Sequence, residues 1–172
     1  DVRLVIDKAN SLVKLYVDDI LKVSSSWAVT ASSFGVYVGS LGVYTSPFGD
    51  FQMAVDNVVV SDSPQQGESN LFSADYESGN FNEWTGNITT SGGSLTISSS
   101  TVHSGSYSGQ YHINSGSGTR RAYSYASFPE QTTVYARAYV NIPSLSLTSG
   151  QSLWLIQIVD SENNPFASYG IR

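Results

Sequence analysis

Apolar and polar residues alternate along much of the chain, and this period-two pattern predicts β-strands. Near the start, Leu4 and Ile6 fall on one side of an extended segment, and Arg3, Val5 and Asp7 fall on the other. The polar stretch 8–11 separates this segment from a second alternating one that ends at 18. Residues 2–18 are therefore predicted to form an antiparallel hairpin, in which lysines discourage further pairing along its edge.

Further strands are predicted wherever short apolar or alternating runs are bounded by Gly, Ser, Asn or Pro. These strands cover residues 19–24, 34–39, 41–45, 51–60, 86–90, 94–98, 107–114, 121–127, 132–141 and 152–160. No segment has the periodicity of an amphipathic helix of three turns, and the two halves of the chain do not resemble each other. The pattern predicts an all-β protein in which short strands form a two-sheet antiparallel sandwich.

Several short motifs resemble those of concanavalin A-like, laminin-G-like jelly rolls. Residues 13–19 (VKLYVDD) are similar to a hairpin of that family, and residues 54–61 (AVDNVVVS) resemble its last strand. Residues 76–84 (YESGNFNEW) are similar to a first strand that the family shares with jelly-roll carbohydrate-binding modules. Residues 103–108 (HSGSYS) resemble the start of a strand in those modules. Residues 134–140 (VYARAYV) resemble a following inner strand. The resemblance spans most of the chain and implies a jelly-roll sandwich.

The motifs occur in a rotated order. The resemblance implies that residues 1–62 are the C-terminal half of a jelly roll, that 63–70 are a linker, and that 71–172 are the N-terminal half. Both chain ends are then expected inside a sheet. Family members usually carry a further pair of strands between the points that correspond to Arg172 and Asp1. Three arrangements therefore remain open: a permuted sandwich closed within one chain, half-domains completed by strand exchange between chains, and an incomplete fragment.

Composition excludes some classes of function. Charged residues make up 13% of the chain and the net charge is −6, which argues against binding to nucleic acid phosphates. No cysteine is present to form disulfides or thiolate metal sites. No apolar run approaches the roughly 20 residues that a transmembrane helix needs. The chain begins at Asp1 without an initiator methionine or a signal peptide, as expected of a processed or excerpted piece.

A calcium site is predicted where the strands of the two halves would meet. Asp56 and Asn57 lie in the last-strand motif, and Asp75 and Glu77 lie at the start of the first-strand motif. If these strands pair, their oxygen ligands come together, and Ca²⁺ takes six to eight oxygen ligands. In the jelly rolls that the chain resembles, acidic residues of these two strands often hold a structural calcium ion. Alternatively, these carboxylates are solvated or cap turns.

Glycan binding is the ligand chemistry that the composition favours, because sugar recognition uses aromatic platforms together with planar polar groups. Tyr123 and Tyr125 are two residues apart and therefore lie on one face of their strand, beside Arg121. These tyrosines form either an exposed platform or part of the core. Trp27, in a serine-rich turn, is predicted to be an exposed aromatic residue. The candidate glycan-binding residues are Trp27, Arg121, Tyr123 and Tyr125.

Catalysis is not predicted. The paired-carboxylate strand motif of jelly-roll glucanases is absent. When residues 71–172 are placed before 1–60, Arg137, Gln157 and Tyr44 follow the order of a lyase of the alginate-lyase type. However, Val159 occupies the position where such lyases have histidine, so the group that would accept a proton is missing.

Asn87 begins the sequence Asn-Ile-Thr, which is an acceptor site for N-glycosylation in secreted proteins. Together with the few lysines and many hydroxyl side chains, it predicts an extracellular or cell-surface protein. The predicted function is a non-catalytic module for glycan binding or cell-surface adhesion. The first alternative is a subunit of an extracellular filament or sheath, joined to neighbouring copies by strand exchange. The second is a polysaccharide lyase or glycoside hydrolase of the jelly-roll type.

Overall fold

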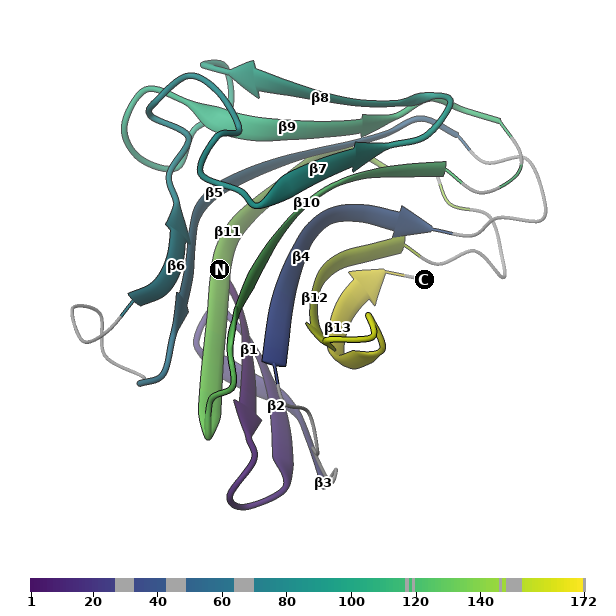
Figure 1. The fold of residues 1–172 in the computed structure, drawn as a ribbon. Coiled ribbons are helices and arrows are strands. Elements are labelled where there is room, and N and C mark those ends of the chain that lie inside the picture. The colour runs from purple at the N-terminus through teal and green to yellow at the C-terminus, as the bar shows by residue number, and fades with distance from the viewer. Residues whose placement is uncertain are drawn as a thin grey trace.

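The computed structural model describes residues 1–26, 33–42, 49–63, 70–116, 118, 120–145, 147 and 153–171, with the backbone alone at 40–42. Every element of these residues is a strand, and the strands form two antiparallel sheets that pack as a sandwich (Figure 1). The predicted all-β, two-sheet class is thus confirmed. In the part of the chain that is described, no helix is long and apolar enough to cross a membrane.

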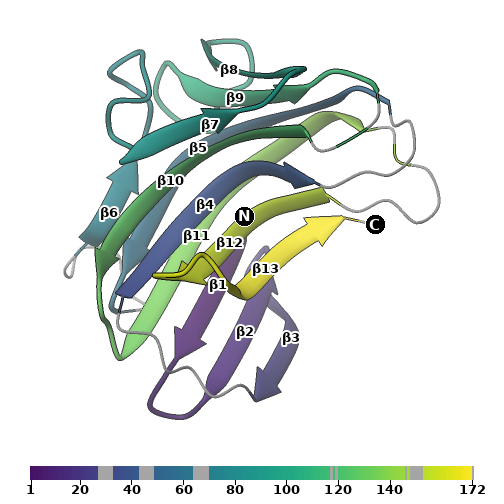
Figure 2. The same cartoon turned by 45° about the vertical axis from the view of Figure 1, so that its right-hand side comes forward.

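The larger sheet has eight strands. Its order is β3 (Ile20–Ser26), β2 (Leu12–Val17), β1 (Val2–Asp7), β11 (Thr133–Leu145), β5 (Phe51–Ser61), β9 (Ser108–Ile113) and β8 (Gly93–Ser98), and β6 (Asn70–Ala74) also pairs with β5. The smaller sheet has five strands, in the order β13 (Pro165–Ile171), β12 (Leu153–Asp160), β4 (Ser33–Gly42), β10 (Arg120–Pro129) and β7 (Gly86–Thr89). The long strands of both sheets bend along their length (Figures 1 and 2).

Strands from the two halves of the chain interleave in both sheets. In the larger sheet, β1 pairs with β11, and β5 lies between β11 and β9. In the smaller sheet, β4 lies between β12 and β10. The first 61 residues therefore complete a sandwich with the rest of the same chain. The N-terminal strand β1 lies inside its sheet, as predicted, but β13 at the other end of the chain forms an edge.

The apolar core lies between the two sheets and follows the period-two pattern. On β1, Val2, Leu4 and Ile6 are buried, and on β4 the buried positions are Phe34, Val36 and Val38. These two strands thus contribute alternate residues to the core cluster and turn the intervening residues outward. At roughly 25 cal/mol per Å² of apolar surface removed from water, this burial is the main stabilising contribution.

A chain of hydroxyl groups crosses the core between the sheets. The Tyr111 hydroxyl donates a hydrogen bond to Ser124 Oγ (3.0 Å), which donates to Asn87 Oδ1 (2.6 Å). The Tyr76 hydroxyl lies 3.1 Å from that of Tyr111, and it donates in this pair because the single Tyr111 proton is already used. These contacts satisfy polar atoms that burial would otherwise leave unpaired. Burial raises the pKa of both phenols, Tyr76 and Tyr111, above the ordinary tyrosine value.

Alkaline pH is expected to destabilise the fold through these two phenols. A raised pKa in the folded state stabilises the fold fully below the unfolded-state value near 10, and this stabilisation falls as the pH rises above that value. The free energy of unfolding should fall by about 1.4 kcal/mol per pH unit for each buried tyrosine. Urea denaturation between pH 9 and 11 measures the slope, which Tyr111→Phe should reduce by about half. Equal slopes in the two proteins would contradict this expectation.

Three details differ from the predicted strands. Residues 34–39 and the start of 41–45 belong to one strand, β4, which runs through Gly39 without a break. The segment 70–74 forms β6, whereas residues 77–84 of the proposed first-strand motif are turns and bends. Finally, β13 has no counterpart among the predicted strands. Its proline, serine and glycine are typical of turns, and pairing with β12 holds it in the sheet.

Candidate functional site

The outward side of the five-stranded sheet carries a row of polar and aromatic side chains, which we call the open face. On β10 the core takes Ala122, Ser124 and Ala126, so the intervening residues at 121, 123, 125 and 127 point outward. On the neighbouring strands, Tyr37 is directly opposite Tyr125 and Gln157. The open face consists of Gly35, Tyr37, Gly86, Arg121, Tyr123, Tyr125, Ser127, Gln157, Val159 and Ser168.

Three tyrosines form the centre of the open face. The rings of Tyr37 and Tyr123 stack with centroids 5.3 Å apart and an interplanar angle of 18°. The Tyr125 ring lies 5.7 Å from that of Tyr37, at an angle of 57°. Partial burial raises the pKa of the Tyr37 phenol, and the neighbouring phenols of Tyr123 and Tyr125 raise it further. The cluster thus offers packed aromatic rings with hydroxyl groups at their rims.

Polar groups flank these rings. The Tyr37 hydroxyl donates a hydrogen bond to Asn163 Oδ1, which anchors the ring to the turn between β12 and β13. Gln157 Nε2 donates to Ser168 Oγ (2.9 Å), so its amide plane is held across two strands. Arg121 is exposed at the far end of the row. The face thus combines fixed aromatic rings with amide, hydroxyl and guanidinium groups.

Glycines leave room for these side chains and for a ligand. A Cβ atom at Gly86 would lie 2.6 Å from the Tyr125 hydroxyl oxygen, so the Tyr125 ring extends over the backbone of the edge strand β7. Gly35 lies between Ser127 and Val159 in the register of the sheet. At this position a pocket of about 170 Å³ opens beside Tyr37. The surface next to the tyrosines is therefore hollowed at one end.

Three of the four residues predicted to bind glycans lie together on the open face: Tyr123, Tyr125 and Arg121. The fourth, Trp27, lies outside the described residues. Tyr123 is only 8% exposed, but it does not belong to the core cluster between the sheets. Sequence reasoning did not connect Tyr37 and Gln157 with these residues. The available signal was that Tyr37 alternates with the apolar positions 36 and 38, which marks it as outward-facing.

Three of the four residues predicted to hold calcium contact one loop, residues 101–107, and the fourth, Asp75, contacts one of these three. Pairing of β5 with β6 brings their strand ends together. Asp56 Oδ2 accepts hydrogen bonds from the backbone N–H groups of His103 (2.9 Å) and Ser104 (3.0 Å). Asn57 Nδ2 donates to Ser104 Oγ (2.6 Å). Two side chains of β5 therefore hold the loop at residues 103 and 104 through hydrogen bonds.

Glu77 holds the same loop at residues 106 and 107. Its Oε1 accepts hydrogen bonds from the backbone N–H groups of Ser106 and Tyr107, both at 2.9 Å. A Cβ atom at Gly105 would lie 2.4 Å from Glu77 Oε1, so a glycine is needed for this close approach. Asp75 Oδ1 in turn accepts from the backbone N–H of Glu77 (3.0 Å). Carboxylates from both strand ends thus fix the loop through its backbone.

Asp56 also has an unsatisfied oxygen. The residue is 3% exposed, and its Oδ1 is buried without a hydrogen-bond partner. Two residues other than glycine with positive φ lie nearby, Asn57 (48°) and Tyr76 (63°). An uncompensated buried carboxylate oxygen is costly, and a cation would compensate it. Among the described residues, no group of three or more His, Cys, Asp and Glu side chains could hold a metal ion, so amide and backbone oxygens would have to complete its coordination.

Glu83 belongs to the same region, although sequence reasoning did not include it. Its Oε2 accepts a hydrogen bond from the backbone N–H of Tyr76 (3.2 Å). Burial raises the pKa of Glu83, and the neighbouring Asp75 carboxylate raises it further. Two carboxyl groups that adjoin in this way share a proton or a cation more readily than either does alone. No sequence signal pairs Glu83 with Asp75, because the turn at 77–82 sets their separation.

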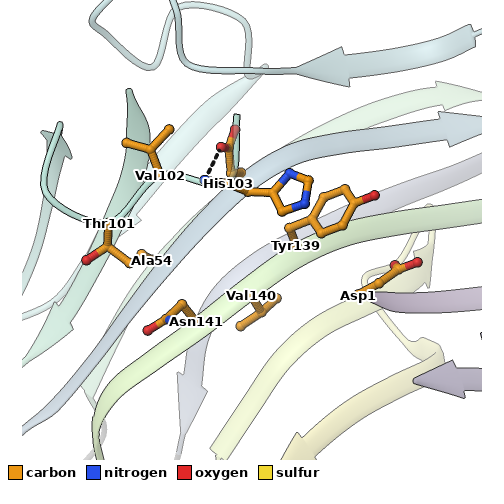
Figure 3. A pocket seen from close by; sticks show the side chains of 9 residues that line it. Asp1, Ala54, Thr101, Val102, His103, Tyr139, Val140 and Asn141 are labelled. Carbon is orange, nitrogen blue, oxygen red and sulfur yellow. Dashed lines mark hydrogen bonds between the residues drawn. The ribbon is translucent and has the colours of Figure 1, made fainter. Parts of the chain in front are cut away.

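A pocket of about 260 Å³ lies beside the 101–107 loop, on the outward side of the eight-stranded sheet (Figure 3). Its wall includes Asp1, Asp56, His103 and Tyr139. The rings of His103 and Tyr139 stack with centroids 3.4 Å apart. Asp1 Oδ1, like Asp56 Oδ1, is buried without a hydrogen-bond partner.

The residues that follow the order of a lyase are not brought together. Arg137 lies on β11 in the eight-stranded sheet, and Gln157 lies on β12 in the five-stranded sheet. Both alternate with core residues and point outward, so they lie on opposite sides of the sandwich. Tyr44 is outside the described residues. Val159 lies on the open face beside Gly35 and offers no proton acceptor there.

Asn87, the predicted glycosylation residue, lies on the edge strand β7 and is exposed. Its Oδ1 accepts the hydrogen bond from Ser124 at the end of the buried hydroxyl chain. The Asn87 side chain therefore lies at the margin of the core, while the strand β7 is exposed to solvent.

Comparison with known proteins gives no assignment, because no family model, curated protein or solved structure matches the chain significantly. The site can be interpreted only from its own chemistry.

Proposed function

We propose that this protein is a non-catalytic, extracellular module that binds glycans or mediates cell-surface adhesion through its open face. The observation that carries this proposal is the cluster of Tyr37, Tyr123 and Tyr125 on adjacent strands, with Gln157 in the same row. Pyranose rings present C–H groups on their faces and hydroxyls at their edges. Aromatic rings complement the faces, and amide and guanidinium groups complement the edges.

The contacts within the open face support a preorganised site. Tyr37 is tied to Asn163 and Gln157 to Ser168, so both side chains are ordered before a ligand arrives. Preorganisation reduces the entropy that binding costs. Arg121 at the end of the row would face the hydroxyl or acidic groups of a longer chain. The pocket beside Gly35 would receive a group at the other end of the row.

The fold that fits this function is a jelly roll of the concanavalin A-like type with its halves in permuted order. The pairing of β5 with β6 supports this interpretation, since it joins the proposed last strand to the strand at the start of the proposed N-terminal half. Asn87 on an exposed edge strand is suited to carry an N-linked glycan outside the cell.

A structural calcium ion beside the 101–107 loop is part of the same proposal. Asp56 would supply its unpartnered Oδ1, and Asn57, Asp75 and Glu77 are the neighbouring side chains with oxygen ligands. The chemistry that calcium would supply is charge compensation for this buried carboxylate, which would hold the loop against β5. It would take no part in binding glycans on the opposite side of the sandwich.

Loss of the central ring tests the proposed function. Tyr37→Ala is expected to weaken glycan binding at least about tenfold, because it removes a stacked ring and frees its two neighbours. Tyr37→Phe should retain most of the affinity, since it loses only the hydroxyl bond to Asn163. A glycan array identifies a ligand for the native protein, and isothermal titration calorimetry then compares the two variants.

Tyr135→Ala is the matched control, because Tyr135 is a half-buried tyrosine on the outward side of the other sheet. It should bind glycans like the native protein. Equal loss in the Tyr37 and Tyr135 variants would contradict the assignment to the open face, and so would absence of any retained glycan. Incubation with uronate polymers should release no unsaturated products that absorb ultraviolet light, in contrast to the lyase alternative.

A further inference from the structure

The two sheets of the sandwich end at different places on the side of β13. The five-stranded sheet ends at β13, whereas the eight-stranded sheet continues through β1 and β2 to β3. Among the described elements, β13 packs against β1 and β2. Figure 2 shows β2 and β3 reaching below β13. We call β2 and β3 the flap, because this part of the eight-stranded sheet extends past the edge of its partner layer.

The inner surface of the flap is apolar and accessible to solvent. Leu15 and Val17 are opposite the core residues Leu4 and Val2 of β1, so they point to the inner side. The next strand continues this surface, because Val23 is opposite Leu15 and Ile20 is opposite Val17. Ile20 is 59% exposed and Val23 is 51% exposed. The row that begins in the core therefore ends in exposed apolar side chains, above which no described strand of the five-stranded sheet lies.

The edge of β13 complements this surface. Among the described strands, β13 pairs with β12 alone. Its backbone groups on the other side are therefore available to a further strand. Residues Pro165–Ile171 carry no charge, and β3 carries only Lys22, which lies in the bulge of its ladder with β2. A strand added to β13 would meet no like charge, and it would lie directly above the flap.

We propose that two copies of this chain form a closed dimer in which β3 of each copy pairs with β13 of the other. Each flap then continues the five-stranded sheet of its partner. Because the flap belongs to the eight-stranded sheet, each layer of the dimer joins the larger sheet of one copy to the smaller sheet of the other. Ile20 and Val23 of both copies become buried between the two layers. The core thus continues through the interface.

The symmetry of this contact favours a pair over a filament. A two-fold axis parallel to the strands would exchange the two layers and place the flap of each copy beside β13 of the other. The edge strands β3 and β13 of both copies are then all paired. An interface of this kind is self-complementary and closes after two copies. The dimer leaves the open face of each copy on the outside. Two glycan sites on one particle would increase avidity for a multivalent surface.

Sedimentation equilibrium of the whole chain over a range of concentrations tests the proposal. The native protein should associate to a dimer and no further. Val23→Lys is expected to raise the dimer dissociation constant by at least about a hundredfold, because it places a charge in the apolar centre of the interface. Leu21→Lys is the matched control. Leu21 lies on the same strand and is 49% exposed, but it is opposite Tyr16 and faces outward.

The control variant should dimerise like the native protein. A native protein that remains monomeric over the whole concentration range, or one that grows into longer assemblies, would overturn the closed dimer. Equal weakening by the two lysine variants would also overturn it, since the contact would then not distinguish the two sides of β3. Circular dichroism of each variant establishes that its strands are retained. Retention of dimerisation in a protein that binds no glycan separates this inference from the proposed function.

Discussion

Replacing Gly39 with alanine is expected to lower the free energy of unfolding by about 3–5 kcal/mol. Gly39 lies in the middle of β4 with φ = 131°, a conformation that L-residues rarely adopt. A Cβ atom there would lie 2.4 Å from the carbonyl oxygen of Ala122 and 2.5 Å from the Cα atom of Tyr123. Both contacts are with backbone, so β10 would have to move away. Urea denaturation followed by tryptophan fluorescence measures the change.

The control is Gly79→Ala. Gly79 also has a positive φ, 72°, but a Cβ atom there would have no neighbour within 4 Å. This variant should lose only about 1 kcal/mol, the cost of the backbone conformation alone. Similar losses at both positions would show that close packing of β4 on β10 is not the cause. The Gly39 variant should also bind glycans more weakly, because Tyr123 lies at the point of contact.

Replacing Asp56 with alanine is expected to cost about 2–4 kcal/mol, because two backbone N–H groups lose a buried, charged acceptor. These groups belong to His103 and Ser104 in the 101–107 loop. The loss should be larger in calcium than in a chelator. Without a cation, removing the unpartnered Oδ1 relieves an unfavourable burial and partly offsets the lost hydrogen bonds. Thermal unfolding in both conditions checks the expectation.

Calcium should raise the melting temperature of the native protein and leave that of the Asp56→Ala variant unchanged. Asp19→Ala serves as a control, because this carboxylate is 77% exposed and forms a surface ion pair with Arg3 (3.4 Å). Its stability should change by no more than about 0.5 kcal/mol. A native protein that responds equally to calcium and magnesium, or to neither, would argue against a calcium site at Asp56. A calcium response that survives in Asp56→Ala would place the ion elsewhere.

Local patterns predicted most of the strands, and the exceptions have a common physical cause. Alternation is clear in β1 and β5 because each has one face against the core. β13 lacks such a pattern and depends on pairing with β12, a tertiary contact that local propensity does not encode. In β4, the break predicted between residues 39 and 41 is absent, because one strand continues through both. Gly39 is instead a point where two backbones approach closely.

The candidate sites were predictable only within single strands. Tyr123 and Tyr125 share a face because they are two residues apart, and Arg121 follows the same period. Tyr37 and Gln157 come from distant segments, and only the register of β4 against β10 and β12 brings them to this row. The carboxylates at 56 and 77 were expected to adjoin. Their use of backbone N–H groups in one loop depends on turn geometry that the sequence pattern does not reveal.

The interleaving of early and late strands constrains how the chain matures during synthesis. β1 needs β11 as a neighbour, and β4 needs both β10 and β12. The ribosome must therefore translate most of the chain before the first 61 residues can find their places. At about 5–20 residues per second, the apolar faces of these strands remain unprotected for several seconds. Chaperones that hold nascent chains would act on this segment above all, and translation speed would influence the yield of folded protein.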